Sequence, residues 1–176
     1  MKPQNRTIVI SVILFFTIAS DQVTKKIAQT YLAGSEIISF FYNIFRLQYI
    51  ENTGGFLGMG AAVPENIRFW VFSILVALFL AALFAYLIFS KNLSRLQFYA
   101  LSVILGGGIG NLIDRLLNDG KVVDFMNVGV GSLRTGIFNV ADLYITFGAI
   151  FLFVLILMEG KEDKEKTSGF PGRAGK

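Results

Sequence analysis

The sequence contains no cysteine and no histidine. The absence of cysteine excludes disulfides and thiol nucleophiles, and the absence of histidine excludes His-ligated metals and any Ser-His-Asp triad. Charged residues are also scarce, at 16% of the chain. Any proton transfer must therefore use aspartate, glutamate, lysine or tyrosine side chains.

Apolar residues are abundant instead. Of the 176 residues, 54% are hydrophobic, and the mean hydropathy is +0.62. This composition is too apolar for an ordinary soluble domain and predicts an integral membrane protein. The net charge is +4, but much of the basic excess lies near the termini, where membrane orientation explains it better than nucleic-acid binding. We therefore expect no nucleic-acid partner.

Four apolar segments are predicted to be transmembrane helices, namely 8–28, 69–89, 98–113 and 135–158. The first also resembles a secretory signal peptide, because a short basic start precedes a short apolar run and a possible cleavage site at Thr17-Ile18-Ala19. We prefer an uncleaved helix, with cleavage as the alternative. Residues 1–158 are then one membrane-embedded domain, and residues 159–176 form a charged tail that we expect to be disordered and cytoplasmic.

Residues 31–60 have a different pattern. Stretches such as 37–41 and 45–50 alternate in polarity and are rich in aromatic and β-branched residues, which predicts short strands. Exposed sheet edges cannot lie in hydrocarbon, so a small β-rich cradle between the first two helices should lie at the membrane surface. Asn52 and Gly54 then mark a turn.

Basic residues near the spans predict the topology. They lie before the first span, between the second and third, and after the fourth, which places these three segments on one side of the membrane. The positive-inside rule makes that side, with both termini, cytoplasmic. The remaining polar positions then gather at the outer interface: Asp21, Lys25, Asn52, Asn111, Asp114, Arg115, Asp124, Asn139 and Asp142.

Several of these residues have ordinary structural explanations. Asp21 and Lys25 are at i and i+4, so they can form an interfacial ion pair with a snorkelling lysine. Asp114 precedes Arg115 directly, which suggests a neutralised pair at a helix end. Asn139 and Asp142 have the spacing of a helix cap followed by an acidic residue in the first turn.

Asp124 has no such explanation, since it follows Val122-Val123 in an extended apolar segment without an adjacent cation. Two carboxylates a few ångströms apart do not readily both ionise, so one keeps a proton and the pair supplies an acid and a base. We therefore choose Asp124 and Asp142 as a catalytic pair of the aspartic-protease kind.

Five motifs resemble, in order and spacing, those of the lipoprotein signal peptidase family, signal peptidase II. They are Asp21-Gln22-Val23-Thr24-Lys25, Asn52-Thr53-Gly54, Gly107-Gly108-Ile109-Gly110-Asn111-Leu112-Ile113-Asp114-Arg115, Val122-Val123-Asp124-Phe125 and Phe138-Asn139-Val140-Ala141-Asp142. One departure occurs after Gly54, where Gly55 is followed at once by Phe56 although the family pattern has two small residues. The departure concerns the shape of that loop and leaves the two aspartates unaffected.

The resemblance implies a four-helix aspartyl endopeptidase of the bacterial inner membrane. Its implied partners are lipid-modified prolipoproteins and membrane lipids. It would cleave the signal peptide just before a cysteine that carries diacylglycerol. Asp124 and Asp142 match the catalytic positions. The positions that match with supporting or substrate-binding roles are Asp21, Lys25, Asn52, Gly54, Asn111, Asp114, Arg115, Asn139 and Ala141. We expect a monomer without a cofactor or metal.

Two other functions fit parts of the sequence. A transporter or channel could use Asp124 and Asp142 as a cation site, although the sequence shows no inverted repeat or pair of broken helices. A serine-lysine peptidase could use Ser20 and Lys25, although a spacing of i and i+5 is a poor match on a helix. The glycines at 106–108 and 110 favour close helix packing, because small residues let neighbouring backbones approach. A phosphate-binding loop is not expected there, because no Lys-Ser or Lys-Thr follows.

Overall fold

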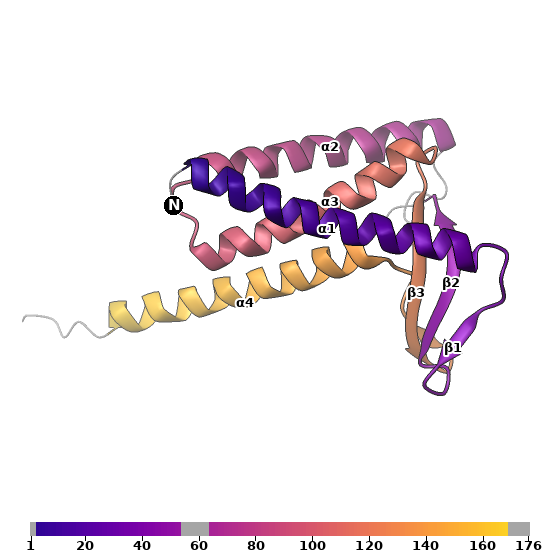
Figure 1. Ribbon diagram of the computed structural model, residues 1–176. Coiled ribbons are helices and arrows are strands. Elements are labelled where there is room, and N and C mark those ends of the chain that lie inside the picture. The colour runs from indigo at the N-terminus through magenta and orange to yellow at the C-terminus, as the bar shows by residue number, and fades with distance from the viewer. Residues whose placement is uncertain (1–2, 54–63, 169–176) are drawn as a thin grey trace, which may run out of the picture.

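The computed structural model describes residues 3–53 and 64–168. Within them the chain forms helices and strands in the order α1 (Pro3–Leu32), β1 (Ile38–Phe40), β2 (Phe45–Asn52), α2 (Glu65–Phe89), α3 (Arg95–Leu117), β3 (Val122–Val130), β4 (Leu133–Arg134) and α4 (Val140–Ser168). The helices form a bundle, and the strands form a small sheet at one end of it (Figure 1). The predicted mostly helical architecture with a β-rich region is confirmed.

Among the described residues, three stretches are long and apolar enough to cross a bilayer: Gln4–Leu32, Arg95–Leu117 and Val140–Gly160. Helix α2 contributes a shorter apolar stretch, Ser73–Phe89. The expected spans in α1, α3 and α4 are therefore supported by length and composition, whereas the span expected in α2 stays a prediction. Because lipid is as apolar as these side chains, such helices associate through close packing rather than through a hydrophobic driving force.

Helix α3 lies at the centre of the bundle, and half of its apolar window is buried, compared with 17% for α1 and 11% for α4. Glycines in α3 permit this position. A Cβ atom at Gly107 would lie 2.6 Å from the Ala141 carbonyl oxygen of α4, and one at Gly110 would lie 2.6 Å from Asp21 Oδ2 of α1. The glycine run therefore serves close packing, as the sequence predicts, and it brings α3 against both neighbours at the level of the polar residues.

The sheet is antiparallel with the order β1-β2-β3-β4. Strands β1 and β2 come from the connection between α1 and α2, whereas β3 and β4 come from the connection between α3 and α4. The prediction that the β-rich region lies between the first two helices is thus incomplete, because half of the sheet comes from the second connection. The extended segment around Asp124 is β3, a strand of this sheet.

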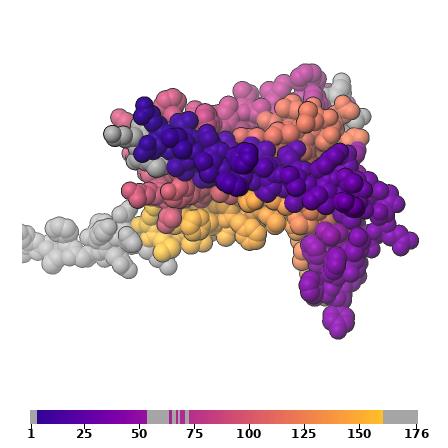
Figure 2. Space-filling model, viewed as in Figure 1, coloured from indigo at the N-terminus to yellow at the C-terminus, as the bar shows by residue number. Residues whose placement is uncertain are grey.

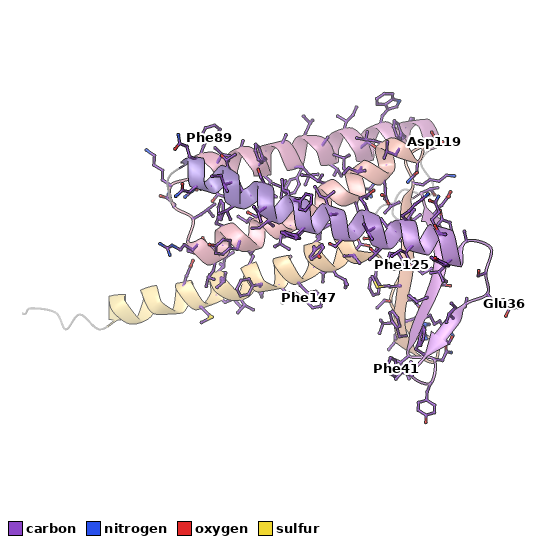
Figure 3. All side chains as sticks on the ribbon, viewed as in Figure 1. Glu36, Phe41, Phe89, Asp119, Phe125 and Phe147 are labelled. Carbon is purple, nitrogen blue, oxygen red and sulfur yellow. The ribbon has the colours of Figure 1, made fainter. Side chains whose placement is uncertain are left out.

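The sheet projects sideways from the bundle, beyond the first turns of α4 (Figure 2). Phe125 lies where the sheet joins the helices and is buried with Ala28 and Leu32 of α1, while Phe41 lies at the far tip (Figure 3). The start of α1 and the last turns of α4 are at the opposite end of the bundle from the sheet (Figure 1). The sheet therefore lies at one end of the bundle, and the start of α1 and the last turns of α4 lie at the other.

Helices α3 and α4 differ from the sequence-based expectation at their ends. Helix α3 continues to Leu117, so Asp114 and Arg115 lie within the helix rather than after it. Helix α4 begins at Val140 instead of Thr135, and it continues through Ser168 into the segment expected to be a disordered tail. Gln97 near the start of α3 donates to Glu159 Oε2 of α4 (2.7 Å), which fixes α4 beyond Met158. The expected turn at Gly54 and the shortened motif at Gly55-Phe56 lie outside the described residues.

Candidate active site

Asn139 precedes α4 and forms a reciprocal cap with Asp142. The Asp142 backbone N–H donates to Asn139 Oδ1 (3.0 Å), and the Asn139 backbone N–H donates to Asp142 Oδ2 (3.1 Å). This arrangement satisfies two backbone donors at the helix start and places a carboxylate where the helix dipole favours negative charge. The predicted cap is therefore present, and it fixes the Asp142 carboxylate.

A short pairing between two segments aligns Asn139 with β3. Phe138 and Met126 exchange two backbone hydrogen bonds of 2.8 Å each, just before α4 begins. As a result, the Asn139 side chain lies beside β3, where its Nδ2 donates to Asp124 Oδ1 (2.6 Å). Asn139 is fully buried and contacts both aspartates, one through its side chain and one through its backbone.

Asp124 is buried and accepts a second hydrogen bond from Asn52 Nδ2 of β2 (2.9 Å to Oδ2). The pKa of Asp124 is raised to about 6, chiefly by burial, with a further contribution from the negative charge of Asp142. The hydrogen bonds from Asn52 and Asn139 and the charge of Lys25 act in the opposite direction. Asp124 therefore holds a proton more readily than an exposed aspartate does.

The second oxygen of Asp142 is bound from α3, where Asn111 Nδ2 donates to Asp142 Oδ1 (2.8 Å). Asn111 Oδ1 in turn accepts from Asn139 Nδ2 (3.0 Å) and from Lys25 Nζ (2.9 Å). Each oxygen of the two aspartates thus has an amide donor. These donors come from β2, α3 and the start of α4, so the site depends on three separate segments.

Lys25, Asp21 and Asp114 form a buried ionic cluster next to Asn111. Lys25 Nζ lies 2.8 Å from Asp21 Oδ2 and 3.0 Å from Asp114 Oδ2, and each of the three side chains is at most 4% exposed. The predicted Asp21–Lys25 pair is present, but the interpretation of Lys25 as a snorkelling interfacial residue is wrong. Asp114 forms its ion pair with Lys25 of α1, and not with its sequence neighbour Arg115 as the sequence suggests.

The carboxylates of this cluster also bind the backbone. Asp21 Oδ1 accepts from the Ala141 N–H (2.9 Å), and Asp114 Oδ2 accepts from the Val123 N–H (2.9 Å). Asp21 therefore holds the first turn of α4, and Asp114 holds β3 next to Asp124. The matched position Ala141 is fully buried and contributes its backbone N–H rather than a reactive group.

A cavity of about 540 Å³ opens beside the two aspartates. Its polar lining includes Asn52, Asn111, Arg115, Asp124 and Asp142, and its other walls are formed by Val76, Gly108, Val122, Thr135, Gly136, Ile137, Phe138, Leu143, Ile145, Thr146 and Phe147. Along α4, Asp142 precedes the apolar residues, so the cavity becomes apolar toward the middle of the bundle. A ligand with a peptide portion and a long apolar portion fits this distribution.

Arg115 contributes a positive charge to the cavity. One of its nitrogens, Nη1, donates to the Asn111 backbone oxygen (3.3 Å), and the guanidinium is near enough to Asp142, Asp124 and Asp114 for their charges to influence it. A guanidinium has five N–H donors, so it has donors with which to bind a peptide carbonyl in the cavity.

The serine-lysine alternative does not match the geometry. Ser20 Oγ lies 2.9 Å from Tyr144 Oη and donates to backbone oxygens of α1, while Lys25 is engaged by the ionic cluster. Among the residues that the structure describes, no group of three or more Asp, Glu, His or Cys side chains is placed to hold a metal ion.

Two contributions to the site were not predicted from the sequence. Gln22 Nε2 donates to Asp114 Oδ1 (2.9 Å) and to the Gly110 carbonyl oxygen (3.2 Å), which joins α1 to α3 beside the ionic cluster. Its place between Asp21 and Lys25 was the only available signal. The apolar cavity residues on α2 and α4, such as Val76 and Phe147, resemble ordinary lipid-facing residues in the sequence and gave no signal.

A helical membrane protein with two linked aspartates at a cavity has the arrangement of a membrane-embedded peptidase of the aspartic type. Residues 13–158 match the family model of signal peptidase (SPase) II. The chain therefore belongs to the signal peptidase II family and is a peptidase.

Individual relatives and solved structures agree. The lipoprotein signal peptidase of Caldicellulosiruptor bescii is 37% identical over 86% of this chain and 93% of its own length, and that of Chlorobium phaeobacteroides is 39% identical over 80% and 94%. Two solved bacterial membrane enzymes superpose with TM-scores of 0.73 and 0.70, at 28% and 25% identity. They cover 85% and 95% of this chain, and 92% and 94% of their own.

Proposed function

We propose that the protein is an aspartyl endopeptidase that removes signal peptides from diacylglyceryl-modified prolipoproteins. It acts at the outer face of the bacterial inner membrane and cleaves just before the lipidated cysteine. The observation that carries the proposal is that Asn139 joins Asp124 and Asp142 at one cavity. The names of the relatives supply the class of substrate, since they are lipoprotein signal peptidases.

The proposed topology has four spans with both termini in the cytoplasm. Lys91 lies between α2 and α3 and Arg95 begins α3, at the end of the bundle where α1 starts, and basic residues favour the cytoplasmic side. The sheet and the two aspartates then lie at the outer interface. Water for hydrolysis is available there, and the substrate's lipid chains remain in the bilayer.

The unequal surroundings of the two aspartates suggest their roles. Asp124 is buried with a raised pKa of about 6, so it is the protonated member. Asp142 is half-buried at the start of a helix and accepts hydrogen bonds on both oxygens, so it is the ionised member. An ionised Asp142 can take a proton from water, while Asp124 donates its proton to the scissile carbonyl oxygen.

Hydrolysis then follows with all protons accounted for. The water oxygen bonds to the carbonyl carbon, its proton passes to Asp142, and the carbonyl oxygen receives the Asp124 proton, which gives a tetrahedral diol. Asp142 next donates its proton to the leaving nitrogen as the carbon–nitrogen bond breaks, and Asp124 recovers a proton from the diol. The products are the carboxyl end of the signal peptide and the free amino group of the lipidated cysteine.

The other matched residues have supporting roles in this proposal. Arg115 and Asn52 line the cavity and bind the peptide backbone or the aspartates, and Asn111 and Asn139 hold the carboxylates. Asp21, Lys25, Asp114 and Ala141 fix α1, α3, β3 and α4 around them. Gly54 remains a proposed contributor outside the described residues. Since all of these groups belong to one chain, a monomer suffices.

The apolar walls of the cavity suit the substrate's hydrophobic parts. Val76, Leu143, Ile145 and Phe147 come from α2 and α4, and Phe147 is 64% exposed on the outside of α4 (Figure 3). A lipid-modified peptide can therefore enter from the bilayer with its chains against these helices. Membrane lipids contact the same apolar surface when substrate is absent.

The test replaces Asp124 and Asp142 separately with asparagine in the purified protein. Each change keeps the side-chain shape but removes the acid or the base, so cleavage of a diacylglyceryl-modified prolipoprotein should fall by roughly 1000-fold or more. The same prolipoprotein without the lipid should be a poor substrate of the wild-type enzyme. Substantial cleavage by either variant would disprove the aspartate pair.

A further inference from the structure

Lys25 is a buried cation that the proposed reaction does not use. Its side chain is 3% exposed, and its ammonium contacts Asp21 (2.8 Å), Asp114 (3.0 Å) and the Asn111 side-chain oxygen (2.9 Å). An ammonium has three N–H donors, so these three contacts use all of them. The two carboxylates already more than balance the charge of the ammonium. Ion pairing therefore does not explain the third contact, which is with a neutral amide.

That third contact, together with one from Asn139, sets the orientation of the Asn111 amide. Its Oδ1 accepts from Lys25 and Asn139, and its Nδ2 donates to Asp142 Oδ1 (2.8 Å). An ammonium cannot accept a hydrogen bond. A flipped Asn111 amide would therefore direct N–H groups at Lys25 and oxygen at the Asp142 carboxylate, and both contacts would be repulsive.

We propose that Lys25 is a positioning residue for the aspartate pair: its hydrogen bond to Asn111 keeps the Asn111 N–H on the Asp142 carboxylate. The inference rests on the proposed function, because it concerns which aspartate acts as the base. It assigns Lys25 a role that acts through Asn111, separate from its pairing with Asp21 and Asp114.

Other charged groups also face the aspartate pair and must be distinguished from Lys25. Asp124 faces Asp142 from β3, and Arg115 faces both from α3. Asp114 of α3 and Asp21 of α1 lie beyond Asn111, on Lys25. Arg115 can act on Asp142 directly by its charge, whereas the proposed effect of Lys25 requires the Asn111 amide.

The first experiment measures how the Lys25→Met variant cleaves a diacylglyceryl-modified prolipoprotein across a range of pH. The methionine has a similar length but no N–H donors. Asn111 then loses the hydrogen bond from Lys25 that keeps its N–H on Asp142, so the acidic limb of the kcat profile should move to higher pH by about 0.5–1 unit. We expect kcat to fall roughly 10-fold with little change in KM, because substrate contacts are retained.

A charge-matched pair of variants separates positioning from stability, since Lys25→Met alone leaves two buried carboxylates unpaired. The double variant Lys25→Met/Asp21→Asn keeps the net charge of the cluster, and Asp21→Asn alone is its control. Asp21→Asn breaks the same ion pair but retains the Lys25–Asn111 contact. We expect the double variant to show the shifted acidic limb and Asp21→Asn to keep the wild-type limb, with thermal melting in detergent reporting on folding for both.

A second background tests whether Lys25 acts through Asn111. In Asn111→Ala protein, adding the Lys25→Met/Asp21→Asn changes should move the acidic limb no further than Asn111→Ala alone does. The inference is overturned if the two effects add, or if Asp21→Asn shifts the limb as much as the double variant. If the wild-type enzyme does not cleave the prolipoprotein, the proposed function itself is overturned. If the wild-type enzyme cleaves it and the Lys25→Met/Asp21→Asn variant has the wild-type acidic limb, only the inference about Lys25 is overturned.

Discussion

Asn139 has two structural roles, one in capping α4 and one in joining the two aspartates. Its side-chain oxygen and backbone N–H cap α4, and its side-chain nitrogen binds Asp124, Asn111 Oδ1 and the Val123 carbonyl oxygen. Replacing it with alanine removes both sets of contacts. Replacing it with serine keeps an oxygen that caps a helix but removes the nitrogen.

We therefore predict different outcomes for the two variants. Asn139→Ala should lower the free energy of unfolding by about 1 kcal/mol or more through the lost cap, and Asn139→Ser should retain most of that stability. Both should lose cleavage by roughly 100-fold, because neither joins the two aspartates. Thermal melting and prolipoprotein cleavage measure the two effects, and wild-type cleavage by Asn139→Ser would contradict the joining role.

Asn52 provides a test of the protonation of Asp124. The pKa of Asp124 is raised to about 6, and the hydrogen bond from Asn52 favours the ionised form and lowers it. If Asp124 is the acid, kcat/KM should fall as pH rises through about 6. Removing the donor in Asn52→Ala raises the pKa of Asp124 further, so the alkaline limb should move to higher pH.

The neighbouring residue supplies the control for this experiment. Glu51 is exposed at the end of β2, and its carboxylate pairs with Lys121 (3.0 Å) rather than with the aspartate pair. Glu51→Gln should therefore leave the alkaline limb in place. An alkaline limb that stays in place in Asn52→Ala, with an acidic limb that moves to higher pH, would assign the proton to Asp142 instead.

At the scale of the helices, the contact between α3 and α4 depends on Gly107. A Cβ atom there would lie 2.6 Å from the Ala141 carbonyl oxygen and 3.0 Å from Ile145 Cγ1. The first contact is with backbone, which cannot rotate away. Gly107→Ala must therefore separate the two helices and displace Asp142, which lies directly after Ala141.

We predict that Gly107→Ala destabilises the protein by about 1–3 kcal/mol, as overpacking usually does, and lowers cleavage as well. Gly160→Ala is the control, because Gly160 is a helical glycine of α4 with no atom within 4 Å of an added Cβ. It should be neutral or slightly stabilising, since alanine favours helix more than glycine does. Equal melting temperatures for the two variants would contradict this account of the glycine run.

The sequence predicted those elements and residues whose signal is local. The helices follow from apolar length, and the cap follows from the spacing of Asn139 and Asp142. The position of Asp124 within the same sheet as Asn52 could not be predicted, because β2 and β3 come from distant segments and their register depends on tertiary packing. Lys25 was misread for a related reason: its i+4 partner gave a sufficient local explanation, and its contacts with Asp114 and Asn111 are not local.

At the scale of the whole molecule, the absence of cysteine permits a direct test of topology. Tyr42 is fully exposed at the tip of the sheet, and Lys91 is exposed between α2 and α3. A membrane-impermeant maleimide that can reach the outer face of an intact inner membrane should label a Tyr42→Cys variant. It should label Lys91→Cys only after the inner membrane is permeabilised, and the reverse pattern would contradict cytoplasmic termini.

The division of the sheet between two connections has a consequence for biosynthesis. Asp124 binds Asn52, which is made before it, and Asn139, which is made after it, while Asp142 lies on α4, which is made after α3. An incomplete chain therefore has no aspartate pair, however well its first helices are inserted. If the two aspartates are the catalytic pair, cleavage requires α4 to have packed against α3, so a chain truncated before Asp142 should be inactive.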